Sequence, residues 1–244
     1  RGSQVQPGPR QVLLGWLGSG RLFSLVLFVI SVGLLGHLLT SPAFGVWQVD
    51  VEGNSLLTDA DVLNLTGVHG RPVWFVDTEA VAQHVRQSAY VEQAHVQVSL
   101  PDRATITIVE RRPEVRWQTG GVQYLVDGSG KVIDSADDQA DADTLVIVAQ
   151  PEMRLQPNDQ LDRKTLELAR ALALRLPTEL QLTPAVIGWD AGLGVYIRTA
   201  TDQTVVFGQP EDLDRKLAIF GSLLADQTTF RYLDLRSADP FYQL

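Results

Sequence analysis

The sequence predicts an α+β protein with three parts: an N-terminal transmembrane helix, a small domain of order β-α-α-β-β, and a mixed β-rich domain with flanking helices. Residues 22–49 form a long uncharged run, residues 46–112 show strand and helix patterns in that order, and short strand patterns surround two amphipathic helices in residues 114–244. The expected boundaries are 1–21 for a cytoplasmic tail, 22–44 for the span, 45–113 for the first domain and 114–244 for the second.

Length and hydrophobicity predict the membrane span. Its core, Leu22–Leu39, would rise about 27 Å as a helix, and Thr40–Phe44 can complete the crossing of a hydrocarbon layer about 30 Å thick. Two other interpretations stay open. Ser41-Pro42-Ala43 loosely resembles a signal-peptide cleavage site, although the apolar stretch is longer than in a usual signal peptide. A buried core helix is disfavoured because the segment has no polar face.

The charges on the two sides of the span predict its orientation. Three arginines and no acid precede it, namely Arg1, Arg10 and Arg21. Because cationic flanks stay on the cytoplasmic side during insertion, we expect the N-terminus in the cytoplasm and both domains outside the cell membrane. His37, near the outer end, is expected to snorkel to the interface rather than to titrate inside the membrane.

Charge and cysteine content argue against several function classes. The 17 basic and 29 acidic residues beyond the span give that part a net charge of −12, which disfavours nucleic acid as a partner. Without cysteine there is no disulfide, thiol nucleophile or thiolate metal ligand. The four histidines are scattered, with no metal or nucleophile spacing. We therefore expect no enzyme activity, no cofactor and no small-molecule substrate.

The first exported domain is expected to open with a strand over Val46–Val51. Thr58 then stands as an N-cap, with Asp61 at the capping-box position, so a short helix should run to about Leu65. A second helix is expected over Thr78–Gln87. A hairpin follows, with strands Val91–Leu100 and Arg103–Arg111 joined by Pro101-Asp102.

These blocks carry a family resemblance. The β-α-α-β-β order resembles a POTRA domain. The amino-acid sequences of Val46–Asp77 and Tyr90–Pro113 resemble the bacterial division protein family FtsQ, called DivIB in some lineages. The most specific pieces are Gly53-Asn54, the Pro101-Asp102 turn and the exit Glu110-Arg111-Arg112-Pro113. Their order directly behind a membrane anchor makes the resemblance strong.

Turn signals and helical periodicity predict the second exported domain. Gly120-Gly121 should connect strands Glu114–Thr119 and Val122–Asp127 in a two-residue hairpin. One helix is expected from Leu161 to Leu176, closed by Pro177, and another over Leu213–Leu224. The further expected strands are Lys131–Ile133, Val146–Val148, Ala185–Trp189, Val195–Arg198, Thr204–Phe207 and Phe230–Arg236.

Asp134–Asp143 is acidic, rich in alanine and without apolar periodicity, so we expect a mobile loop. A calcium site is conceivable there or in the Asp127–Gly130 turn because carboxylates cluster in both. Neither stretch has the ligand spacing and closing glutamate of an EF-hand loop, so no metal is expected.

The resemblance implies a non-catalytic scaffold of the division complex, located in the cell membrane at the division septum. Such a protein links early division proteins to the FtsB/FtsL-type (DivIC/FtsL) complex and to septal cell-wall synthesis. Two rivals stay open. A POTRA-containing component of translocation or outer-membrane assembly would need repeated POTRA units or a barrel. A membrane-anchored exported hydrolase would need a nucleophile and a base within reach.

The resemblance also implies where a partner binds. The segment Phe230–Arg236 contains Asp234-Leu235-Arg236, which resembles the last sequence element of this family. The resemblance implies that the edge of this last strand pairs with a segment of a partner protein. A regular strand would direct Tyr232, Asp234, Arg236 and Ser237 outward, with Leu233 and Leu235 facing the core. The expected partner-binding residues here are Tyr232, Asp234, Leu235, Arg236 and Ser237. The other interpretation is an ordinary buried last strand.

Two further surfaces are open. Gln97 lies in the hairpin strand Val91–Leu100, where the resemblance implies contact with division proteins that arrive earlier. Its neighbours Val96 and Val98 are expected in the core. Phe241 and Tyr242 are either an aromatic anchor for a partner or part of a disordered terminus.

Overall fold

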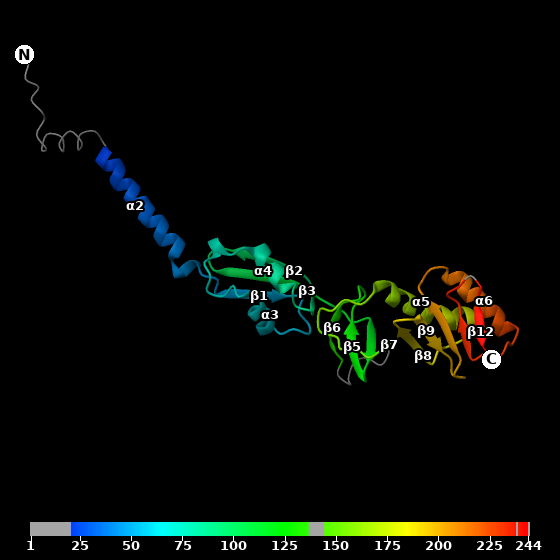
Figure 1. Cartoon of the computed structure of the whole chain (residues 1–244). Coiled ribbons are helices and arrows are strands. Elements are labelled where there is room, and N and C mark those ends of the chain that lie inside the picture. Colours follow the sequence, from blue (N-terminus) through cyan, green and yellow to red (C-terminus); the bar gives the residue numbers. More distant parts are fainter. Residues whose placement is uncertain (1–20, 137–143, 238, 244) are drawn as a thin grey trace, which may run out of the picture. The chain divides into compact units, whose positions relative to one another are not determined.

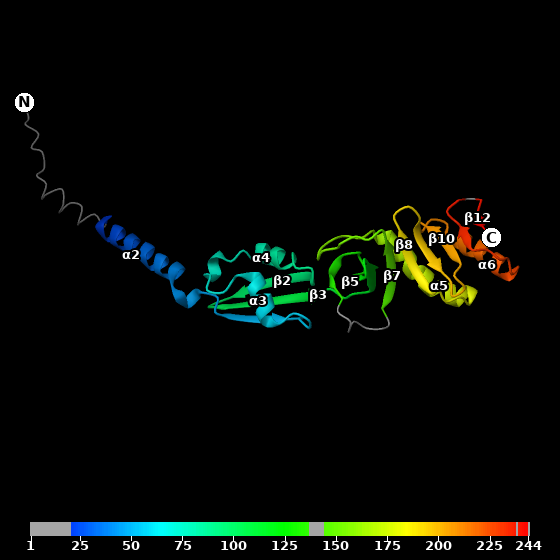
Figure 2. The same cartoon turned by 60° about the horizontal axis from the view of Figure 1, so that its bottom comes forward.

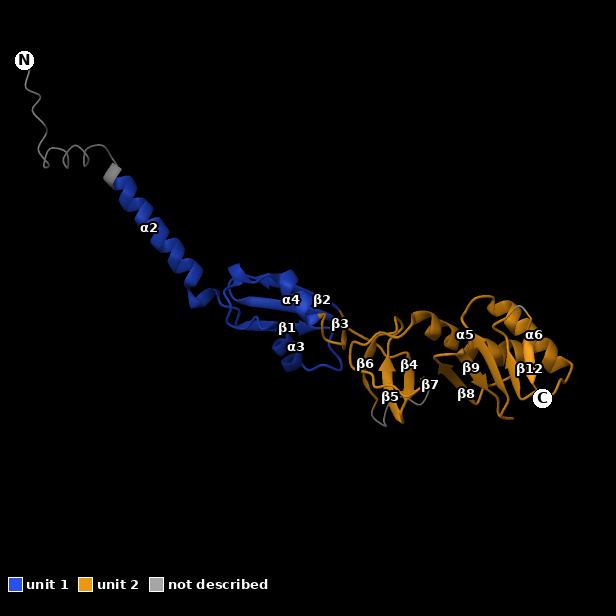
Figure 3. Ribbon diagram, viewed as in Figure 1, with its two compact units in different colours: residues 1–85, 93–108 blue, residues 86–92, 109–244 orange. Residues whose placement is uncertain are grey.

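The computed structural model describes residues 21–136, 144–237 and 239–243. These form two compact units, one of residues 1–85 and 93–108 and the other of residues 86–92 and 109–244, called unit 1 and unit 2 below (Figure 3). The expected cytoplasmic tail, apart from Arg21, and most of the predicted acidic loop Asp134–Asp143 lie outside the described residues.

Unit 1 begins with the long apolar helix α2 (Arg21–Thr40), drawn in dark blue in Figure 1. Its residues Phe23–Thr40 are long and apolar enough to cross a membrane, and none of that stretch is buried within the protein. The Thr40 hydroxyl donates to the carbonyl of Gly36 over 2.8 Å, and a short 3₁₀ turn, η1 (Pro42–Phe44), follows. The helix therefore has the length and composition that the sequence predicts for a span.

The rest of unit 1 is a three-stranded sheet in the order β1-β3-β2. Its elements in chain order are β1 (Gln48–Glu52), α3 (Asp59–Thr66), η2 (Val73–Phe75), α4 (Thr78–Val85), β2 (Val91–Ser99) and β3 (Arg103–Glu110). β1 runs parallel to β3, with Gln48 opposite Arg103. The predicted β-α-α-β-β order is confirmed: Thr58 and Asp77 cap α3 and α4, and β2 and β3 each carry buried apolar side chains.

The start of α3 shows how local chemistry sets this order. The Asp61 amide donates to the Thr58 hydroxyl over 3.2 Å, and the Thr58 amide donates to the Asp61 carboxylate over 3.0 Å. The hydrogen bonds from Thr58 lower the pKa of Asp61. Gly67, at φ +57°, ends the helix in the left-handed conformation. The predicted capping box is confirmed because it needs only residues three apart.

Unit 2 is built on a nine-stranded mixed sheet in the order β12-β11-β10-β9-β8-β7-β4-β5-β6. The strands are β4 (Val115–Thr119), β5 (Val122–Val126), β6 (Val132–Ser135), β7 (Leu145–Gln150), β8 (Val186–Asp190), β9 (Gly194–Arg198), β10 (Thr204–Gly208), β11 (Tyr232–Asp234) and β12 (Phe241–Gln243). Two helices accompany them, α5 (Arg163–Leu180) and α6 (Leu213–Ala225). The predicted hairpin is confirmed, since Thr119 pairs with Val122 across Gly120 and Gly121, both at positive φ.

Helix α5 crosses β7, β8 and β9, as both views show (Figures 1 and 2). The prediction that Pro177 closes this helix is wrong: α5 continues through Pro177 to Leu180, and Gln181 caps it in the left-handed conformation. Proline removes one amide donor, but Leu176 is fully buried and Leu180 packs against the same core. Burial of these two leucines holds the last turn helical despite the missing hydrogen bond.

The core of unit 2 lies between the sheet and its helices. Phe220 of α6 contacts Phe207 of β10 and Phe230, with ring centroids 6.3 and 6.4 Å apart in edge-to-face geometry. Leu172 of α5 and Leu233 of β11 are also fully buried in this cluster. The described part of the chain is therefore α+β as predicted, with strands and helices sharing one core in unit 2.

Candidate functional site

The C-terminal end of the unit 2 sheet carries most of the residues predicted to bind a partner. β11 runs parallel to β10, with Val205 opposite Leu233, and antiparallel to β12, with Leu233 opposite Tyr242. The prediction that Phe230–Arg236 is the outermost strand is therefore wrong. Within the described residues, β12 is the strand at this end of the sheet, and Phe241 and Tyr242 are 62% and 48% exposed.

At the end of β11, Asp234 and Arg236 form a two-point ion pair. The Arg236 Nε and Nη2 atoms donate to Asp234 Oδ1 and Oδ2 over 3.0 and 2.7 Å, and the Arg236 amide donates to Oδ1 over 3.0 Å. These hydrogen bonds lower the pKa of Asp234, against the opposing effect of burial. The pair is thus charged and fixed in geometry, with the Arg236 side chain still 41% exposed.

The Arg236 side chain lies against the backbone of two glycines. Its Nη1 atom donates to the carbonyl of Gly192 over 2.9 Å. Gly208 has φ +73°, and a Cβ atom there would lie 2.6 Å from Arg236 Cγ. The register of β9 and β10 shifts between Val206 and Gly208, so the backbone turns where the arginine passes. The ion pair depends on this close approach of side chain to backbone.

A hollow of about 320 Å³ adjoins the ion pair. Lys216 of α6 borders it and is only 4% exposed, and its Nζ atom donates to the carbonyls of Phe207 and Gln209 over 2.8 and 2.7 Å. Burial lowers the pKa of Lys216. Arg215, also on the rim, donates to the carbonyl of Ser237 over 3.2 Å. The start of α6 is thereby held against β10 and the segment that follows β11.

The remaining predicted residues of this end divide into core and surface. Leu235 is 1% exposed and belongs to the hydrophobic core, so its prediction as a partner contact is corrected: alternation turns it inward beside Leu233. Tyr232 is half-buried, and burial together with the charge of Asp234 raises its pKa. Ser237 is exposed but lies beyond the end of β11 rather than on its face.

Gln97 belongs to unit 1, where it is an exposed residue of β2. Its neighbour Val96 is 4% exposed and Val98 is half-buried, as strand alternation predicts. The six predicted residues therefore do not form one site within a single unit.

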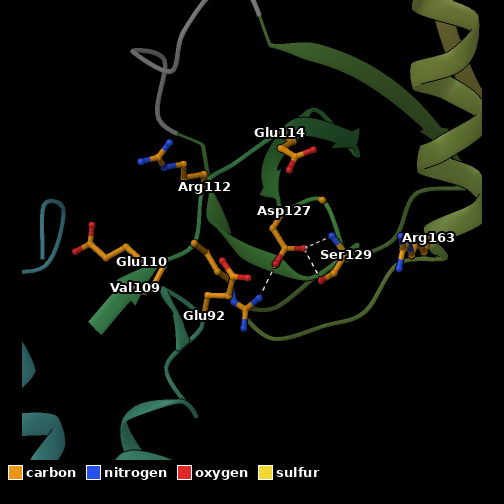
Figure 4. A pocket seen from close by; sticks show the side chains of 10 residues that line it. Glu92, Val109, Glu110, Arg112, Glu114, Asp127, Ser129 and Arg163 are labelled. Carbon is orange, nitrogen blue, oxygen red and sulfur yellow. Dashed lines mark hydrogen bonds and ion pairs between the residues drawn. The ribbon is translucent and has the colours of Figure 1, made fainter. Parts of the chain in front are cut away.

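A second hollow of about 490 Å³ is lined only by residues of unit 2 (Figure 4). On its wall, Arg111 donates to Asp127 Oδ2 over 2.6 Å, and the Ser129 amide and the Lys131 amide donate to Oδ1 over 2.8 and 2.9 Å. Burial raises the pKa of Asp127, but these hydrogen bonds outweigh it and lower the pKa overall. Both oxygens of this carboxylate are used: Oδ1 holds the turn before β6, and Oδ2 pairs with Arg111 (Figure 4).

Among the described residues, no group of three His, Cys, Asp or Glu side chains lies close enough together to hold a metal ion, in these hollows or elsewhere. Arg111 and Asp127 on the wall of the larger hollow pair with each other, and Lys216 and Arg236 beside the smaller one donate to backbone carbonyls. Sequence reasoning missed Gly192, Gly208, Arg215 and Lys216. One signal was available for Lys216: it lies three residues after Leu213 and four before Phe220, on the apolar face of α6.

Comparison with known families identifies both units. Residues 44–111 match the model of the POTRA domain, FtsQ-type, and residues 115–236 match the model of the C-terminal region of cell division protein FtsQ/DivIB. The second match ends at Arg236, before β12.

Similar proteins cover nearly the whole chain. A cell division protein FtsQ from Chloroflexus aurantiacus is 48% identical over 239 residues, which is 98% of this chain and 88% of that protein. One from Chloroflexus aggregans is 48% identical over 237 residues, 97% of this chain and 87% of that protein. One from Mycobacteroides abscessus is 27% identical over 219 residues, 89% and 67% respectively. The chain belongs to the FtsQ family of bacterial cell division proteins.

Proposed function

We propose that this protein is a non-catalytic, single-span scaffold of the bacterial division complex. Its N-terminus lies in the cytoplasm, and both units lie outside the membrane at the division septum. There it connects early division proteins to an FtsB/FtsL-type (DivIC/FtsL) complex and to septal cell-wall synthesis. The domain boundaries proposed are 1–21 for the tail, 22–44 for the span, 45–113 for the POTRA domain and 114–244 for the C-terminal domain.

The observation that carries the proposal is the C-terminal end of the unit 2 sheet. β12 is short, its three residues are exposed, and only β11 pairs with it among the described strands. An edge strand presents backbone donors and acceptors that a partner strand can satisfy. The adjoining Asp234–Arg236 pair is rigid and partly exposed, so it can select the partner at little cost in side-chain entropy.

The span strengthens such an interaction. A helix like α2 confines the exported units to a thin layer beside other membrane-anchored proteins, which raises their effective concentration. Modest affinity at a three-residue edge strand is then sufficient.

Capture of a purified FtsB/FtsL-type complex by the detergent-solubilised full chain tests the edge. We expect Tyr232→Ala with Arg236→Ala to weaken binding about thirtyfold, since losing two central contacts costs about 2 kcal/mol. Arg198→Ala is the matched control: this arginine ends β9, at the opposite end of the strand from Gly194, and pairs only loosely with Asp202 at 3.7 Å. Undiminished capture by the double variant would discard the edge proposal.

A truncation after Ser237 distinguishes two ways of pairing. If the partner strand adds beside β12, removing β12 abolishes capture. If the truncated chain captures as well as the full chain, the partner pairs with β11 instead, and β12 has no part in recognition. Circular dichroism of both proteins checks that unit 2 stays folded.

A further inference from the structure

One end of the POTRA-type domain in unit 1 exposes large apolar side chains, called the aromatic end below. Trp47 is 50% exposed, Trp74 39%, Phe75 62% and Leu100 61%, and Phe44 beside them is half-buried. Soluble proteins rarely gather so many large apolar groups without a partner. The scaffold function above does not use them.

Backbone hydrogen bonds bring these residues together from three segments. The Val46 amide donates to the Arg71 carbonyl over 2.9 Å, and the Gly70 amide donates to the Val46 carbonyl over 2.8 Å. The Trp47 amide donates to the Asp102 carbonyl over 2.9 Å, which fixes the turn between β2 and β3, with Leu100, beside β1. The start of β1, the loop before α4 and the β2–β3 turn therefore meet at one end of the sheet.

Ring contacts make the surface rigid. Phe44 lies against Trp74 with ring centroids 5.3 Å apart, and Trp47 lies edge-on to His69 at the same distance. The His69 and Arg71 side chains are exposed beside these rings. The aromatic end therefore combines apolar rings with polar groups at their border, as the side chains of a membrane interface do.

The connection to α2 is short and structured. Six residues lie between Thr40 and Trp47, so their Cα atoms are at most about 25 Å apart when the chain is fully extended. Hydrogen bonds shorten this distance: the Phe44 amide donates to the Ser41 carbonyl over 3.1 Å, and Trp47 Nε1 donates to the Pro42 carbonyl over 2.8 Å. The indole of Trp47 is thus tied directly to the first residues after the helix.

We propose that the aromatic end lies in the lipid headgroup region and seats the POTRA-type domain on the membrane. The occupant of this surface is lipid rather than a protein, because the surface is continuous with the chain that leaves the apolar helix. Indole rings prefer the layer between hydrocarbon and water, and Arg71 can reach lipid phosphates from the border. The inference rests on α2 crossing the membrane, as in the proposed function, and holds for either orientation.

The absence of cysteine in the chain makes the test direct, since single cysteines can carry a nitroxide label without background. The full chain is placed in phosphatidylcholine/phosphatidylglycerol nanodiscs with a label from Phe75→Cys or Leu100→Cys. The matched control is Leu56→Cys, which is 67% exposed and lies beyond the other end of β1. Collisions of the label with oxygen, which concentrates in lipid, are compared with collisions with a water-soluble nickel complex.

We expect the oxygen-to-nickel collision ratio at positions 75 and 100 to be several-fold higher than at position 56. Equal ratios at the three positions would overturn the inference, and so would labels shielded from both reagents, because that pattern indicates a protein contact. A fourth label from Ile30→Cys, inside α2, separates this inference from the proposed function. If the label at position 30 is exposed to lipid but the labels at positions 75 and 100 are exposed to water, only the contact of the POTRA-type domain with the membrane is refuted. An aqueous label at position 30 refutes the span, and with it both proposals.

Discussion

Two charged side chains of unit 2 that leave water, Asp127 and Lys216, are each held by several hydrogen bonds. Asp127 is 7% exposed and accepts hydrogen bonds from Arg111, Ser129 and the Lys131 amide. Lys216, 4% exposed, donates to two carbonyls. Removing one partner leaves the other group buried without compensation, so substitution of these residues is destabilising.

Asp127→Asn should lower the free energy of unfolding by about 3 kcal/mol, because Arg111 is left buried without its counter-charge. Ser129→Ala, which removes one hydroxyl donor, should cost about 1 kcal/mol. Urea unfolding of the detergent-solubilised chain, followed by near-ultraviolet circular dichroism, measures both. Equal effects of the two changes would contradict the role given to the ion pair.

The lowered pKa of the Asp127 carboxylate predicts that the free energy of unfolding depends on pH. This pKa is lower in the folded protein than its ordinary value of 3.8, so the folded state holds fewer protons than the unfolded state below that value. The stabilisation is complete above pH 3.8 and is lost as the pH falls below it toward the folded-state pKa. The free energy of unfolding of the wild-type protein should therefore fall more steeply than that of Asp127→Asn in this range. Parallel curves would refute the assignment.

At the scale of elements, strands and caps follow local signals, whereas their ends depend on contacts. The Thr58 capping box and the Gly120-Gly121 hairpin form where predicted. Helix α5 passes Pro177 because burial of its last turn outweighs a lost hydrogen bond. Similarly, β11 is not the edge strand of the unit 2 sheet as expected, because β12 pairs with its outer side.

Gly208→Ala tests the junction of β10 with the ion pair. The left-handed backbone and the 2.6 Å approach to Arg236 Cγ should together cost about 2 kcal/mol or more and displace the guanidinium from Asp234. Gly67→Ala is the control, since its backbone is also left-handed but nothing lies within 4 Å of the added Cβ; it should cost about 1 kcal/mol. Thermal unfolding gives both values, and partner capture should fall only for Gly208→Ala.

At the scale of the whole molecule, the described residues form one apolar helix, a POTRA-type domain and an FtsQ/DivIB-type C-terminal domain. The helix and the family together indicate a single-pass membrane protein. The distribution of charge, with three arginines up to the first residue of α2 and all acids after the helix, predicts which side the units occupy.

Single cysteines in the otherwise cysteine-free chain test this orientation. A membrane-impermeant maleimide added to intact spheroplasts should label Leu56→Cys and should label Ser3→Cys only after lysis. The positive flank holds the N-terminus inside, which is the physical reason for the difference. The reverse pattern would place both units in the cytoplasm and remove the scaffold function proposed above.

The sequence by itself determined the α+β class, the apolar helix, the order of elements and the family, because these depend on periodicity, caps and turn residues a few positions apart. It also predicted that the side chains of Asp234 and Arg236, two residues apart at a strand end, point in the same direction. Strand alternation also predicted the burial of Leu235. Only the tertiary structure decided that β12 covers β11, and that Gly192, Gly208 and Lys216 lie around the ion pair. Those facts depend on separate segments meeting in one sheet, and no local pattern encodes that meeting.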